Sequence, residues 1–168
     1  IRDRLASGWS VVERLNVLSV NLRNLELNNT MSQNFENFTK NNINELVSLD
    51  KSIFDPYWQN SEAAFIETLD SCNQNYLFKQ YDEDLLVGYA ILGVTRNFSF
   101  LQRFGISLGY QNKGHGSELL KNVLNFAKDN KFTNIRLNTQ ENNKAAKNLY
   151  LKHGFELTKT NFTILNAS

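Results

Sequence analysis

The sequence predicts a mixed α/β fold in which helices pack on a sheet with at least one parallel crossover. Short apolar segments with alternating periodicity follow one another through residues 76–108, as in an antiparallel meander. Beyond residue 114 the apolar period becomes helical, and a strand and a second helix follow, which is the order of a crossover connection. The length of 168 residues fits about one domain.

The N-terminal residues are expected to form two strands. Segments 9–15 and 18–25 alternate apolar and polar side chains and meet near Asn16. This pattern predicts a hairpin, which would be a strand extension within residues 1–30.

Helices and further strands are expected along the rest of the chain. Thr39 can cap a helix that ends before Pro56, because proline disfavours helix in the residue that precedes it, and a second helix is expected at 61–69. The remaining expected elements are strands 76–81, 85–92 and 98–108, a helix from Gly114 to near Asn130, strand 135–138, a helix capped by Asn142 or Asn143 and ending at Gly154, and a hairpin of 155–158 and 162–165.

Composition excludes several classes of site. Eighteen Lys and Arg residues against 17 Asp and Glu residues give a net charge of +1, too little for general phosphate binding, so a nucleic-acid partner is not expected. One cysteine and two histidines cannot build a disulfide or a zinc site within the chain, so no metal is expected. No apolar run is long enough for a membrane span, and the chain is expected in the cytoplasm.

A glycine-punctuated turn connects strand 98–108 to the helix after Gly114. The spacing Gly109-x-x-x-x-Gly114 matches a Walker loop, but His115-Gly116 stands where Lys-Ser/Thr is required. A dinucleotide fingerprint would need a third glycine, and Leu119 occupies that position. Neither nucleotide motif is therefore predicted.

The same turn suits an anion. Gly114 and Gly116 allow main-chain amides to approach a ligand, and a helix N-terminus adds unpaired donors and partial positive charge. Lys113 adds a cation, so a pyrophosphate is the expected ligand. The alternative is that both glycines only serve a tight turn.

A second motif follows on the helix after Asn143. Asn143 and Tyr150 are seven residues apart, two helical turns, so they share one face with the small Ala146 between them. This arrangement leaves room for a ligand. The alternative for Tyr150 is packing in the core, which is the usual role of an aromatic residue on a buried helix face.

Together the two motifs resemble the GCN5-related N-acetyltransferase (GNAT) superfamily. The matching patterns are Gln111-x-x-Gly114-x-Gly116 and Asn143-x-x-Ala146-x-x-Leu149-Tyr150-x-x-x-Gly154-Phe155. Within the superfamily they are most similar to the ribosomal-protein alanine acetyltransferase type. The resemblance implies one GNAT domain over residues 1–168, with a mixed central sheet, an antiparallel N-terminal meander, a splayed parallel pair of strands and flanking helices.

The resemblance also implies acetyl transfer from acetyl-CoA to a primary amine, of a small molecule or a protein N-terminus, through a tetrahedral intermediate. Pantetheine would lie between strands 98–108 and 134–139, main-chain amides at 106–108 would hold the oxyanion, and Tyr150 would protonate the departing thiolate. The implied CoA-binding residues are Ile106, Ser107, Leu108, Gln111, Asn112, Lys113, Gly114, His115, Gly116, Ser117, Asn143, Ala146 and Tyr150.

The reaction also needs a general base, because an alkylamine with a pKa of about 10.4 must lose a proton before it attacks. The alanine-acetyltransferase type has a Glu where this chain has Asn138. Glu141 is ranked first as the base, before Asp55 and Glu62, although each can equally be a solvated surface carboxylate. The loop of residues 55–58 would cover the acceptor site, or its two aromatics would cap the core. Candidate acceptor-binding residues are Asp55, Trp58, Arg103 and Asn138.

Two alternatives to an acetyltransferase remain. The missing glutamate at Asn138 would suit an acyl-CoA-binding module without catalysis. Gly105-x-Ser107-x-Gly109 also matches the nucleophile elbow of serine hydrolases, but the helix begins too far beyond Ser107. The expected partner is thus an amine or peptide acceptor, with neither nucleic acid nor membrane, and the chain is expected to be a monomer or a homodimer.

Overall fold

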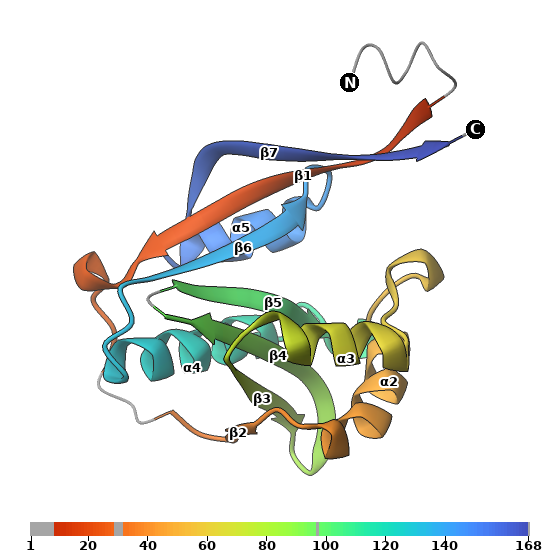
Figure 1. Ribbon diagram of the computed structural model, residues 1–168. Coiled ribbons are helices and arrows are strands. Elements are labelled where there is room, and N and C mark those ends of the chain that lie inside the picture. The colour runs from red at the N-terminus through yellow and green to blue at the C-terminus, as the bar shows by residue number, and fades with distance from the viewer. Residues whose placement is uncertain (1–8, 29–31, 97, 168) are drawn as a thin grey trace. The chain divides into compact units, whose positions relative to one another are not determined.

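The computed structural model describes residues 9–28, 32–96 and 98–167, and it has the mixed α/β fold that the sequence predicts. The strands and α-helices in chain order are β1 (Trp9–Asn21), β2 (Phe35–Asn37), α2 (Ile43–Lys51), α3 (Glu62–Ser71), β3 (Gln74–Asp82), β4 (Leu85–Thr95), β5 (Phe98–Ile106), α4 (His115–Asp129), β6 (Asn134–Gln140), α5 (Lys144–Lys152) and β7 (Glu156–Ala167) (Figure 1).

The chain forms two compact units. Residues 21–135 make up the central unit, and residues 1–20 with 136–168 make up the terminal unit. No helix among the described residues is long and apolar enough to cross a membrane. The same part of the chain contains no group of three or more His, Cys, Asp or Glu side chains that could hold a metal ion.

The central unit has an antiparallel sheet of order β2-β3-β4-β5, covered on both faces. Leu77 of β3 belongs to a buried cluster with Leu46 of α2 and Phe65 of α3. Its neighbour Phe78 points to the other face, where its ring centroid lies 5.2 Å from that of Phe126 in α4. Figure 1 shows α4 on the face of this sheet opposite α2 and α3. Strand β4 is therefore buried continuously from residue 87 to 94, which explains its run of apolar residues.

Local signals placed the helices correctly. Thr39 donates its N–H to the Asn42 side chain at 2.8 Å, in a capping box that precedes α2. Ser61 caps α3 by accepting from the N–H of Ala64 at 3.2 Å. Helix α4 begins directly after Gly114. Both helices before the meander, and the helices on either side of β6, are thus confirmed.

The N-terminal hairpin predicted within residues 1–30 is wrong. Residues 9–21 form the single strand β1, which pairs antiparallel with β7. Asn16 does not turn the chain: it lies inside β1 opposite Asn161 of β7, and its side-chain amide donates to the Asn161 side chain at 3.2 Å. Residues 1–8, 29 and 30 of the predicted extension lie outside the described residues.

The hairpin predicted for residues 155–158 and 162–165 is also wrong, because residues 156–165 all belong to the single strand β7. Neither this segment nor residues 9–25 contains a glycine or proline, which tight turns favour. Strand β2 was not predicted: it has three exposed residues and exists because it pairs with β3.

Candidate functional site

The turn between β5 and α4 has the backbone that an anion site needs. Asn112 and Gly114 both have positive φ, at +61° and +88°, and Gly114 occupies the cap position of α4. A Cβ at Gly114 would meet no atom within 4 Å, so this face of the turn is open. The first amides of a helix have no acceptor within it, and a glycine supplies no side-chain cap. The turn can therefore offer main-chain donors to a negatively charged group.

Three side chains of this turn are directed to its own surroundings. Gln111 donates to the Ile106 carbonyl at 3.0 Å, and the Lys113 ammonium lies 5.3 Å from the Tyr110 ring centroid. His115 Nδ1 lies 3.2 Å from the Gln80 amide nitrogen, and its Nε2 lies 3.6 Å from an oxygen of Asp82. The imidazole thus contacts β3, and the predicted contact of His115 with CoA stays a prediction.

The end of β5 uses two of its main-chain donors internally. Ser107 donates its N–H to the Val87 carbonyl at 2.7 Å, and Leu108 donates to the Ser52 carbonyl at 3.1 Å. Neither amide is available to hold an oxyanion unless these bonds open, which corrects the expectation for these two positions. The Leu108 side chain is 69% exposed.

Ser107 lacks the features of a nucleophile elbow. Its φ of −52° and ψ of 140° are ordinary, whereas an elbow is strained. Its hydroxyl lies 2.7 Å from that of Ser52, and the next α-helix begins only at His115. The structure therefore gives no support to the hydrolase alternative.

The second predicted motif lies in the terminal unit. Asn143 caps α5 by accepting from the N–H of Ala146 at 3.1 Å. Tyr150 is only 6% exposed, and its ring centroid lies 5.6 Å from that of Phe155. Burial raises the pKa of the Tyr150 phenol above its usual value. A cap and a packed aromatic residue are structural roles, and the predicted contacts of both residues with CoA stay predictions.

The three carboxylates considered as the base are all exposed. Glu141 lies after β6, where its N–H donates to the Arg14 carbonyl at 2.7 Å, while Asp55 and Glu62 flank the connection between α2 and α3. The side chain of Asn138 is exposed as well. Their exposure agrees with the alternative that they are solvated surface carboxylates, and it does not identify one of them as the base.

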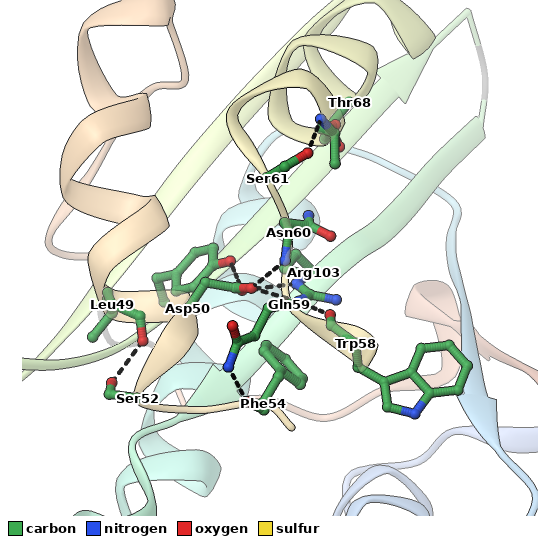
Figure 2. Close-up of polar contacts among 12 residues, drawn as sticks. Leu49, Asp50, Ser52, Phe54, Trp58, Gln59, Asn60, Ser61, Thr68 and Arg103 are labelled. Atoms are coloured by element: carbon green, nitrogen blue, oxygen red, sulfur yellow. Dashed lines mark hydrogen bonds and ion pairs between the residues drawn. The ribbon is translucent and has the colours of Figure 1, made fainter. Parts of the chain in front are cut away.

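A buried ion pair, which the sequence analysis missed, lies beside the connection between α2 and α3. The Asp50 side chain is fully buried, and Arg103 of β5 donates to both of its oxygens, from Nε at 3.0 Å and from Nη2 at 2.7 Å. The Tyr89 hydroxyl and the Asn60 main-chain N–H also donate to this carboxylate, at 2.5 and 2.6 Å (Figure 2). All its partners are thus donors, which is what a buried carboxylate requires.

This environment fixes the charge states of the donors. Burial, followed by the charge of Asp50 and the hydrogen bond to it, raises the pKa of the Tyr89 phenol. Burial alone would lower the pKa of Arg103, but the hydrogen bond and the nearby negative charge outweigh it, so the pKa is raised. Tyr89 therefore stays a neutral donor, and Arg103 stays a cation.

Arg103 also holds the segment of residues 54–60, which we call the aromatic loop. Its Nη2 donates to the Trp58 carbonyl at 2.6 Å, and the guanidinium lies 3.7 Å from the Phe54 ring centroid (Figure 2). The Tyr57 and Trp58 rings meet edge to face at 5.0 Å. Tyr57 is 65% exposed, so it does not cap the core. Arg103, predicted to bind the acceptor, is thus engaged with the protein itself.

The aromatic loop and β5 fit closely at Gly105. A Cβ there would lie 2.4 Å from Ile53 Cγ2 and 3.1 Å from Phe54 Cζ. Gly105→Ala should therefore lower the free energy of unfolding by about 1–3 kcal/mol, measured by urea denaturation. Gly109→Ala is the matched control, because a Cβ at Gly109 meets nothing within 4 Å. Equal stability of the two variants would contradict the close fit.

Comparison with known proteins identifies the family. Residues 43–155 match the model of the Acetyltransferase (GNAT) family. The chain belongs to the GNAT family. The GNAT chain is 28% identical to "Probable N-acetyltransferase san" of Drosophila melanogaster over 127 aligned residues. This alignment covers 73% of this chain and 67% of that protein.

Solved structures show that the chain has the GNAT fold. A GCN5-related N-acetyltransferase from Sphaerobacter thermophilus is similar with a TM-score of 0.70 at 14% identity, over 98% of this chain and 54% of that one. The PaiA N-acetyltransferase from Thermoplasma acidophilum, solved in complex with coenzyme A, has a TM-score of 0.60 at 16% identity, over 80% and 98% of the two chains. This GNAT chain therefore spans about half the length of the first of these relatives.

Proposed function

We propose that this GNAT chain transfers an acetyl group from acetyl-CoA to a primary amine of a small molecule or of a peptide N-terminus. The observation that supports it most is the turn that opens α4. Gly114 is left-handed there, with open space where a side chain would be. A pyrophosphate needs main-chain donors that no side chain covers, so the residues present fit CoA.

The proposal assigns binding roles to residues of the turn, of α5 and of the aromatic loop. Acetyl-CoA supplies the activated thioester when bound. Gly114 and Gly116 let the main chain of the turn approach the pyrophosphate, and the exposed Lys113 adds positive charge. Asn143 and Ala146 would contact the CoA arm from α5. The acceptor amine would enter beside the aromatic loop, where Tyr57 and Trp58 present ring surface.

Proton transfer is the remaining task. Burial keeps the Tyr150 phenol protonated at neutral pH, the form that can donate a proton to a leaving thiolate. The acceptor amine must lose a proton before it attacks. Glu141 remains our first candidate for this role, through water, since it is exposed at the end of β6.

A combined assay tests this function through Gly116→Val. Thiol release from acetyl-CoA is followed with a panel of small amines and peptide N-termini, and CoA affinity is measured by calorimetry. Wild type should turn over at least one acceptor. Gly116→Val should weaken CoA binding at least about tenfold, the loss of one charged hydrogen bond, because its side chain would intrude on the phosphates.

The control for this assay is Gly109→Val, which adds the same side chain earlier in the same connection, where a Cβ meets nothing within 4 Å, and it should weaken CoA binding much less than Gly116→Val. Unchanged affinity in a folded Gly116→Val variant would contradict the placement of the pyrophosphate. Tight CoA binding by wild type without turnover across the panel would instead support an acyl-CoA-binding module.

A further inference from the structure

The aromatic loop is bound at two main-chain positions to the same ion pair. The Trp58 carbonyl accepts from Arg103 at 2.6 Å, and the Asn60 N–H donates to Asp50 at 2.6 Å. The other hydrogen bonds of the loop are local, such as that from the Gln59 side chain to the Phe54 carbonyl at 2.9 Å. The ion pair therefore connects the loop to both α2 and β5 (Figure 2).

Asp50 occupies a position that is energetically unfavourable for a carboxylate. Asp50 lies in the last turn of α2, where the helix dipole is negative. Its side chain is fully buried, and that of Arg103 is 15% exposed. A buried ion pair often stabilises no better than apolar residues of the same volume. What apolar residues cannot supply is the pair of directional bonds to Trp58 and Asn60.

We propose that Asp50 and Arg103 are positioning residues, which hold the aromatic loop in the shape that receives the acyl acceptor. The inference rests on the proposed function, in which the loop borders the acceptor site. The ion pair would then determine the affinity for the acceptor. The left-handed Gly114, proposed to bind the pyrophosphate, lies beyond β5 in the turn that opens α4, so a change confined to the aromatic loop should alter the Kd of CoA less than the KM of the acceptor.

Arg103→Lys is the decisive variant. Lysine keeps the positive charge but has no planar fork, so one ammonium cannot hold both Asp50 oxygens and the Trp58 carbonyl in the same geometry. Two controls accompany it. Glu45→Gln removes a carboxylate from the same helix, where Glu45 pairs with Lys79 at 3.0 Å. Tyr76→Phe removes a hydroxyl that donates to the Gln74 side chain at 2.8 Å and leaves every donor to Asp50 in place.

Two measurements are made on the full chain. Amide hydrogen exchange of residues 54–60 should become about tenfold faster in Arg103→Lys, as expected for the loss of one charged hydrogen bond. With the best acceptor of the amine and peptide panel, KM for that acceptor should also rise about tenfold, while kcat and the Kd of CoA change less than about twofold. Both control variants should stay within about twofold of wild type in all four quantities.

The outcomes separate the inference from the function on which it rests. Unchanged exchange in Arg103→Lys would overturn the role of the pair in holding the loop. Faster exchange with an unchanged KM would overturn the acceptor role, as would an equal loss of CoA affinity. Absence of turnover by wild type would overturn the proposed function and the acceptor role with it, while exchange would still report whether the pair holds the loop.

Discussion

Replacing Arg103 with methionine should lower the free energy of unfolding by about 3–5 kcal/mol. Methionine fills a similar volume but leaves the fully buried carboxylate of Asp50 with only neutral donors, the Tyr89 hydroxyl and the Asn60 N–H. An uncompensated buried charge is among the costliest single changes in a core. Urea denaturation at pH 7 measures it: the midpoint should fall while the m-value stays constant.

The double variant Arg103→Met/Asp50→Leu provides the control. It removes both charges and leaves no carboxylate to neutralise, while the Tyr89 hydroxyl and the Asn60 N–H lose their acceptor, so part of the lost stability should return. A double variant that is less stable than Arg103→Met would show that the two residues stabilise the protein independently. It would contradict the view that the single variant suffers from an unpaired buried charge.

Tyr150→Phe should lower kcat by about 10²-fold or more, the usual contribution of a general acid. Only the hydroxyl is removed, and the ring can keep its contact with Phe155, so the fall in kcat should exceed any change in the stability of the fold or in the Kd of CoA. Because burial raises the pKa of the phenol, wild type should show no loss of activity from ionisation of Tyr150 below about pH 10. Steady-state kinetics from pH 6 to about pH 10 tests both statements.

Tyr76→Phe is the matched control for this experiment. It removes a hydroxyl that donates to the Gln74 side chain at 2.8 Å, which no step of the proposed reaction uses, and should leave kcat unchanged. An unchanged kcat in Tyr150→Phe as well would mean that the Tyr150 hydroxyl takes no part in proton transfer. Proton transfer to the thiolate would then come from another group or from solvent.

Elements with a local cause were predictable from the sequence. Thr39, Ser61 and Asn143 each cap a helix through a side chain that accepts from, or pairs with, a nearby residue. The turn at Gly114 was predictable for the same reason, because a glycine adopts the positive φ that such a turn requires at little energetic cost. Such features depend on a few consecutive residues, so a local sequence pattern contains all the information that is needed to predict them.

Features with a distant cause were not predictable in this way. Alternation predicted strand structure correctly for residues 9–15 and 18–21, but not that these residues form one strand or that its partner would be β7. Asp50 and Arg103 are 53 residues apart, and nothing local shows that they meet. One signal was available: Asp50 follows Ile43 and Leu46 at helical spacing, so it lies on the buried face of α2, where a carboxylate requires a cation.

The pairing of β1 with β7 has a consequence for the order of events during synthesis. Residues 21–135 are contiguous, so the central unit can form its sheet as soon as they leave the ribosome. The edge of β1 that pairs with β7 stays unpaired until residues up to 167 have been synthesised. At ordinary translation rates this takes on the order of 10 s after β1 emerges. A nascent chain stalled at residue 140 should thus expose an unpaired strand edge, the kind of surface that chaperones protect.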